Sequence, residues 1–237
     1  MAIDYTKRPQ QSPAPPAAGS GGAGAGGGKV VLTKGAPKVS LTKSGAVGGT
    51  ARVNLNWSTG APPAPAPTGG FFAKLKAAAA PAAGGIDLDL GCLYELGDGR
   101  KGVIQALGNA FGSLTTPPWI QLDGDDRTGG VVGGENMSIN LGAPGRFRRV
   151  LIFAMIYEGA PNWAAVDGVV TLTSANGQSF EVRLDESDAG ARMCAVAQLV
   201  ESGGDLVFQR EVRYIQGGQM ALDKAYGWGM NWQAGRK

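Results

Sequence analysis

Residues 86–96 read Ile-Asp-Leu-Asp-Leu-Gly-Cys-Leu-Tyr-Glu-Leu, a β-prone run that ends at the turn Gly97-Asp-Gly99. Similar short runs follow it, separated by turns such as Ala175-Asn-Gly177, where glycine supplies the positive φ of a tight connection. They are Trp119–Leu122, Met137–Leu141, Arg149–Tyr157, Gly168–Thr173, Ser179–Leu184, Met193–Val200 and Leu206–Tyr214. This spacing is typical of a β-sandwich or barrel, so the sequence predicts an all-β fold. Only residues 219–226 have the pattern of a helix, which would be short and C-terminal.

The first third of the chain is poor in residues that can form a core. Residues 1–28 end in GSGGAGAGGG and are predicted to be a disordered tail, because no apolar surface offsets their backbone entropy. The domain is predicted to span 29–237. It begins with two similar strands, 29–34 and 38–43, whose lysines suit a sheet edge, and a third strand at 52–57.

A Pro/Ala-rich insertion at residues 58–84 interrupts the predicted domain. Within it, Phe71, Phe72 and Leu75 form an apolar group flanked by lysines, a pattern that suits docking to a partner or a membrane surface. An equally weighted alternative is a loop that packs the two phenylalanines against its own domain.

The overall charge argues against nucleic acid as a partner. The formal net charge is only +3, from 22 basic and 19 acidic residues, and no basic run is long enough to follow a phosphate backbone. Arg146, Arg148 and Arg149 make the most concentrated basic patch, and we interpret them as a solvated strand entrance.

The N-terminus lacks the apolar stretch of a secretory signal. We therefore expect a cytoplasmic protein, with peripheral contact at the inner face of the membrane as a further option.

Two cysteines, Cys92 and Cys194, are too few for a disulfide framework. Both occur within apolar strand-like runs, so we expect reduced, buried thiols.

Acidic residues concentrate between positions 87 and 135. Asp87 and Asp89 flank Leu88 on a strand, so both carboxylates should point to one face. The candidate oxygen ligands are Asp87, Asp89, Asp123, Asp125, Asp126 and Glu135. Such a set suits Ca²⁺, whereas the absence of histidine argues against zinc and copper. The spacing is not that of an EF-hand. An alternative remains at this level, in which the Asp and Gly residues simply cap backbone amides in surface turns.

Several motifs together resemble the TerD family of tellurium-resistance and stress-response proteins. Gly84-Gly-Ile-Asp-Leu-Asp-Leu90 resembles the family strand that carries an Asp-x-Asp pair. Gly124-Asp-Asp-Arg-Thr-Gly129 is similar to the family's Gly-Asp-Asn-x-Thr-Gly loop, and Glu135-Asn-Met-Ser-Ile-Asn-Leu141 to its acidic loop and the following strand. The resemblance covers residues 29–229.

The resemblance implies a TerD-like β-sandwich in which Asp87, Asp89, Asp125, Asp126 and Glu135 fall at Ca²⁺-ligand positions. Gly133 and Gly134 stand where better-known TerD members have aspartates. This departure and the Pro-rich insertion make the chain more similar to the TerA branch. Fewer carboxylates imply weaker binding or the loss of one of two sites.

The function implied is a non-enzymatic, calcium-binding stress-response protein that contributes to tellurium resistance in a complex with other Ter-family proteins. The residues offer no catalytic histidine and no phosphate-binding GxxxxGK motif, so an enzyme is disfavoured. The competing hypothesis is a scaffold sandwich without metal, which docks to a partner or a membrane through the insertion.

Overall fold

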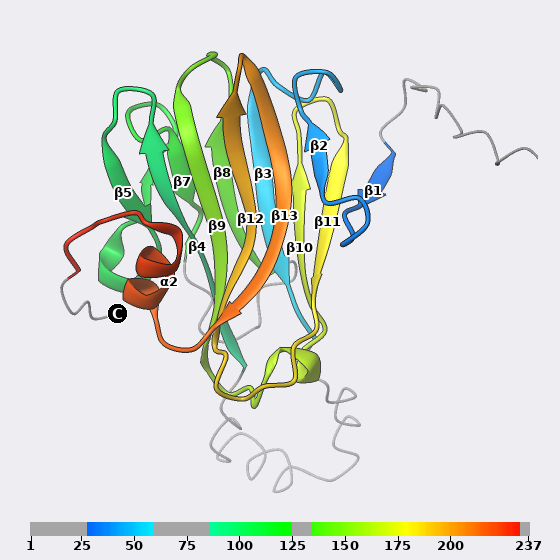
Figure 1. Ribbon diagram of the computed structural model, residues 1–237, viewed down its shortest axis with the longest axis vertical. Helices are drawn as coiled ribbons and strands as arrows, with labels where there is room; N and C mark the ends of the chain where they lie inside the picture. Colours follow the sequence, from blue (N-terminus) through cyan, green and yellow to red (C-terminus); the bar gives the residue numbers. More distant parts are fainter. Residues whose placement is uncertain (1–27, 59–85, 125–133, 233–237) are drawn as a thin grey trace, which may run out of the picture.

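The computed structural model describes residues 28–58, 86–124 and 134–232, which form two β-sheets packed face to face (Figure 1). The predicted all-β sandwich is confirmed. Except for residues 28 and 58, the predicted tail and insertion lie outside the described residues, together with Phe71, Phe72 and Leu75.

The first sheet has seven strands in the order β1-β11-β10-β3-β8-β7-β6. Its pairings are antiparallel, except that β1 runs parallel to β11. The strands are β1 (Lys29–Val31), β11 (Ser179–Leu184), β10 (Gly168–Thr173), β3 (Thr50–Asn56), β8 (Glu135–Asn140), β7 (Ile120–Leu122) and β6 (Gly112–Ser113).

The second sheet has six antiparallel strands in the order β2-β13-β12-β9-β4-β5. They are β2 (Lys38–Ser40), β13 (Asp205–Ile215), β12 (Met193–Ser202), β9 (Phe147–Glu158), β4 (Asp87–Leu96) and β5 (Lys101–Ile104). The two similar N-terminal strands, β1 and β2, are each an edge strand as predicted, but they belong to different sheets. The short strands β5 and β6 were not predicted, because their sequences hold too few alternating apolar residues to be recognised.

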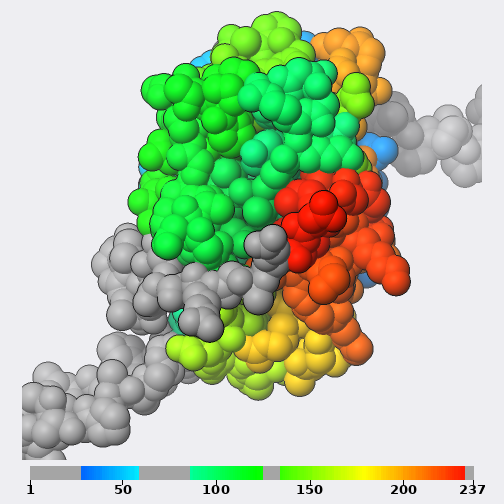
Figure 2. All heavy atoms as spheres, turned by 90° about the vertical axis from the view of Figure 1, so that its left-hand side faces the viewer, coloured from blue at the N-terminus to red at the C-terminus, as the bar shows by residue number. Residues whose placement is uncertain are grey.

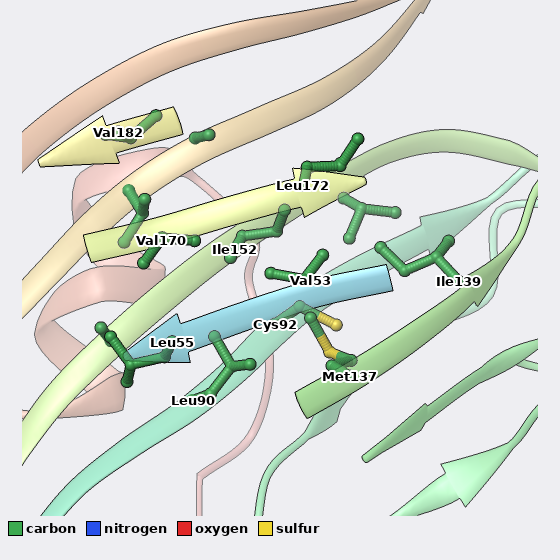
Figure 3. Packing of buried hydrophobic residues seen from close by; sticks show 14 of the residues in the cluster. Val53, Leu55, Leu90, Cys92, Met137, Ile139, Ile152, Val170, Leu172 and Val182 are labelled. Atoms are coloured by element: carbon green, nitrogen blue, oxygen red, sulfur yellow. The ribbon is translucent and has the colours of Figure 1, made fainter. Parts of the chain in front are cut away.

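The core lies between the sheets and is filled by alternate residues of each strand (Figure 3). Leu90, Cys92 and Ile152 of the six-stranded sheet face Val53 and Met137 of the seven-stranded sheet. Such contacts between β-branched and aliphatic side chains are what a period of two along each strand produces.

Both cysteines are buried free thiols, as predicted. Burial raises the pKa of Cys92 and of Cys194, because it removes the thiolate from water; for Cys194 this outweighs the opposing charge of Arg210.

The outer face of the six-stranded sheet is also covered, by helix α2 (Gln219–Tyr226) and the residues that follow it to Trp232. Figure 2 shows this C-terminal segment in red, packed beside the β4–β5 region. The predicted helix is therefore confirmed.

Asp223 in α2 fixes the residues that follow the helix. Its carboxylate accepts hydrogen bonds from the backbone N–H groups of Gly229 and Met230 and from Trp232 Nε1. Burial alone would raise the pKa of Asp223, but these donors lower it below its usual value.

Glu95 on β4 connects this cover to the sheet. Its carboxylate accepts from Arg149 Nε at 2.8 Å and from Arg148 Nη1 at 3.1 Å. The Arg149 guanidinium also lies 3.8 Å from the centre of the Trp228 ring and donates to the Tyr226 carbonyl oxygen near the end of α2. Arg149 therefore belongs to an ion-paired cluster that holds the C-terminal segment, and not to a solvated strand entrance. Arg148 pairs with Glu95, but its side chain is 62% exposed, as the prediction of a solvated strand entrance requires.

Gly91 on β4 has no side chain, so the Phe153 ring can pack against the β4 backbone on the outer face. A Cβ at this position would meet the Phe153 ring and would lie 2.7 Å from the Ile104 carbonyl oxygen. We expect Gly91→Ala to lower the free energy of unfolding by about 1–3 kcal/mol, measured by urea denaturation, because backbone and ring must both shift. Gly35→Ala is the control, since a Cβ there is 3.9 Å from its nearest contact, Thr33 Oγ1. Equal stabilities of the two variants would contradict this account.

The Glu95 cluster should make stability depend on pH. Burial alone would raise the pKa of Glu95, but the hydrogen bond from Arg149 and the charges of Arg149, Lys101 and Arg148 together lower it. A lowered folded-state pKa means that the stabilisation is present above the ordinary glutamate pKa and is lost as pH falls through the folded-state value. We expect Glu95→Gln to cost about 1–3 kcal/mol near neutral pH.

The difference in free energy of unfolding between the wild type and Glu95→Gln should become smaller at acid pH. The measurement is denaturation at a series of pH values. Arg148→Gln is the control and should have a smaller effect, because the Arg148 side chain is 62% exposed. A gap between wild type and Glu95→Gln that stays constant from about pH 7 to about pH 3 would show that the charge of Glu95 is not involved.

Candidate functional site

Asp87 and Asp89 occupy the start of β4, at a point where the strand extends beyond its neighbour. β5 pairs only with residues 92–95, so among the described strands the first residues of β4 pair with β9 alone. Leu88 and Leu90 point into the core, and Asp89 lies between them on the opposite face. Asp87 and Asp89 are nevertheless only 2% and 3% exposed. The strand therefore carries two buried carboxylates close to one free edge.

Glu135 reaches this edge from the other sheet. It is the first residue of β8 and is 3% exposed, and its Oε2 accepts a hydrogen bond of 2.6 Å from the backbone N–H of Leu90. The carboxylate thus lies at the peptide group that joins Asp89 to Leu90. The structure therefore brings three of the predicted site residues, Asp87, Asp89 and Glu135, to one end of the sandwich.

Gly134 allows Glu135 to begin β8 so close to β3. Its φ of +67° is left-handed, and a Cβ would meet the Leu55 carbonyl oxygen. Any other residue would be strained here and would also collide with β3. The resemblance to TerD proteins suggests that Gly134 replaces an aspartate. The backbone geometry gives a separate, structural reason for a glycine at this position.

Asp123 lies elsewhere. Its Oδ2 is 3.2 Å from Arg52 Nη2, and the Asp123 side chain is 47% exposed. Arg52 also donates to Asn136 Oδ1, on the outer face of the seven-stranded sheet. Because Asn136 follows Glu135 on β8, the two side chains point to opposite faces. The structure therefore separates Asp123 from Asp87, Asp89 and Glu135.

Two further predicted ligands, Asp125 and Asp126, lie outside the described residues. Within the described ranges, no three His, Cys, Asp or Glu side chains are arranged so that they alone could hold a metal ion. Asp87, Asp89 and Glu135 thus provide at most part of a coordination shell.

The chemistry of these three groups fits a hard cation. All of them offer carboxylate oxygens, the ligands that Ca²⁺ prefers, and the sequence has no histidine that would favour a softer metal. Burial of an ionised carboxylate costs free energy, which hydrogen bonds or a nearby positive charge can offset. The arrangement therefore offers oxygen ligands of the kind that a hard cation requires.

Some contacts could not be found from the sequence. The Glu95 cluster joins positions far apart in the chain, and its only sign in the sequence was the concentration of Arg146, Arg148 and Arg149.

Among the helices that the structure describes, none is long and apolar enough to cross a membrane.

Comparison with known proteins identifies a curated relative. No family model matches the sequence. The tellurium resistance protein TerA of Alcaligenes sp. is 44% identical over 209 residues, which is 88% of this chain. The chain spans only 58% of the length of that relative.

Two crystal structures are also similar. The unknown function protein SAV2460 gives a TM-score of 0.47 at 17% identity, over 74% of this chain and 94% of the other. A homologue of the telluride resistance protein TerD, SCO6318 from Streptomyces coelicolor A3(2), gives 0.46 at 19% identity, over 73% and 93% of the two chains. On the strength of the sequence identity to TerA, the chain belongs to the TerD/TerA family of tellurium resistance proteins.

Proposed function

We propose that the chain is a non-enzymatic, calcium-binding member of its family that contributes to tellurium resistance in a complex with other Ter-family proteins. The observation that carries this proposal is the hydrogen bond from the Leu90 amide to Glu135. It brings the buried Glu135 carboxylate of one sheet to the strand of the other sheet that begins with the buried Asp87 and Asp89. A divalent cation at this point relieves their mutual repulsion and links the first residues of β4 to the first residue of β8.

The proposed ligand set combines described and undescribed residues. Asp87, Asp89 and Glu135 supply oxygens from the two strands, and Asp125 and Asp126 stay predicted ligands from the segment that precedes β8. Asp123 is not included, because its carboxylate pairs with Arg52 on the outer face. Ca²⁺ suits this combination better than Mg²⁺, since it accepts six to eight oxygens in variable geometry.

The chemistry of the cysteines supports a non-enzymatic role. Reduction or transfer of a tellurium oxyanion by protein thiols requires an accessible thiolate. Both cysteines of the sequence are buried in the core with a raised pKa. The chain therefore contributes to resistance through binding and not through thiol chemistry of its own.

The assembly with other Ter-family proteins is proposed from the family alone. Cytoplasmic location and docking through Phe71, Phe72 and Leu75 stay predictions.

Calcium should stabilise the fold by mass action. With free Ca²⁺ about a hundredfold above the dissociation constant, we expect the melting temperature to rise by about 5–10 °C. Asp89→Asn and Glu135→Gln should each remove most of this shift, because each loses a charged ligand. The measurement is a thermal melt of the full chain with Ca²⁺, with Mg²⁺ and with a chelator, alongside calorimetric titration.

Asp123→Asn is the matched control and should keep the calcium shift, since Asp123 lies on the other face. Loss of the shift in Asp123→Asn but not in Asp89→Asn would place the cation elsewhere. Absence of both heat and stabilisation at millimolar Ca²⁺ would favour the scaffold function, without metal.

A further inference from the structure

A pocket of about 340 Å³ opens at the end of the sandwich opposite to the three carboxylates. β8 connects the two places, since it starts at Glu135 and ends at Asn140, next to the pocket. Three connections form its walls, namely the turn between β2 and β3, the β8–β9 connection and the β12–β13 hairpin. Its volume falls in the range of sites that hold small organic molecules.

The lining of the pocket is mainly apolar. Leu141 and Phe147 are almost fully buried and form its inner part, with Val47 and Leu206 beside them. Glycine backbone forms much of the rim, including Gly142 and Gly145, so the entrance is not closed by long side chains. Such a surface favours the hydrocarbon part of a ligand, because apolar area leaves water on binding.

Arg146 is the basic residue among those that line the pocket, and its guanidinium is held at the edge of the pocket. It donates from Nη1 to the Asn140 carbonyl oxygen at 3.0 Å, and its guanidinium lies 4.6 Å from the centre of the Trp119 ring. Arg148 and Arg149 both pair with Glu95, whereas Arg146 forms no ion pair with any carboxylate of the described residues. The guanidinium is therefore held in place and half-buried, and it keeps donors for an anion.

Glu201 is the carboxylate that also lines the pocket. It lies on the exposed hairpin, where its Oε1 accepts from the backbone N–H of Gly204 at 2.8 Å. An exposed charge is screened by water and salt, so it opposes an anion less than the half-buried Arg146 attracts one.

We propose that this pocket binds a small organic anion with an apolar body and a single carboxylate. The hydrocarbon part lies on Leu141, Phe147 and Leu206, and the carboxylate meets the guanidinium of Arg146. This site is separate from the cation site at the other end of β8, so either can fail without the other.

The first test compares three probes with the same eight-carbon chain: octanoate, 1-octanol and octylammonium. Calorimetry of the full chain should give octanoate a dissociation constant of about 1 mM or tighter, with weaker binding of octanol and weakest binding of octylammonium. Amide NMR shifts on octanoate addition should centre on Gly142, Gly145 and Gly204. Equal affinity for octanoate and octylammonium, shifts centred elsewhere, or no binding of octanoate overturns the proposal.

The second test removes the charge. Arg146→Gln should weaken octanoate binding about tenfold and leave octanol binding unchanged. Arg148→Gln is the matched control, because Arg148 is two positions away but does not line the pocket. Glu201→Gln should bind octanoate no more weakly than the wild type. Equal loss of octanoate affinity in both arginine variants overturns the assignment of Arg146, and the probe series on the wild type remains decisive if Arg146→Gln does not fold.

Discussion

Burial of β4 on both of its faces is the constraint on which the rest of this structure depends. Leu88, Leu90 and Cys92 point into the core between the sheets, and the residues between them point to the outer face. On that face Asp89 belongs to the candidate cation site, Gly91 admits the Phe153 ring, and Glu95 holds Arg149, which contacts the C-terminal segment. A shift of one residue would exchange these two sets, so the register of one strand decides both the packing and the placement of the charges.

The contact between Glu135 and the Leu90 amide joins the two sheets by a polar interaction at one end of an otherwise apolar interface. A buried carboxylate that accepts from a backbone N–H replaces the hydrogen bond that a neighbouring strand would have made at this edge. The same geometry concentrates negative charge at the end of the sandwich. The proposed cation would act on strands of both sheets, so its binding would be coupled to the packing of the two sheets.

The two ends of the sandwich differ in chemistry. One end gathers buried carboxylates, and the other has a mainly apolar pocket with a half-buried arginine. β8 connects the two ends. Glu135, one of the carboxylates, is its first residue, and Leu141, which lines the pocket, follows its last residue. Connections between strands lie at the ends of a β-sandwich, and such loops can change without disturbing the sheets. The two proposed sites therefore lie at opposite ends of one core.

The sequence by itself determined the all-β class, most of the strands, the short C-terminal helix and the buried state of Cys92 and Cys194. These follow from local periodicity, which depends only on neighbouring residues. It also named Asp87, Asp89 and Glu135 as candidates, but it could not distinguish them from Asp123. Only the tertiary structure decided that β1 and β2 join different sheets, that Glu135 reaches β4, and that Asp123 turns outward to Arg52. The reason is that the pairing of strands and the packing of the two sheets depend on contacts between residues far apart in the chain. A local sequence pattern does not predict such contacts.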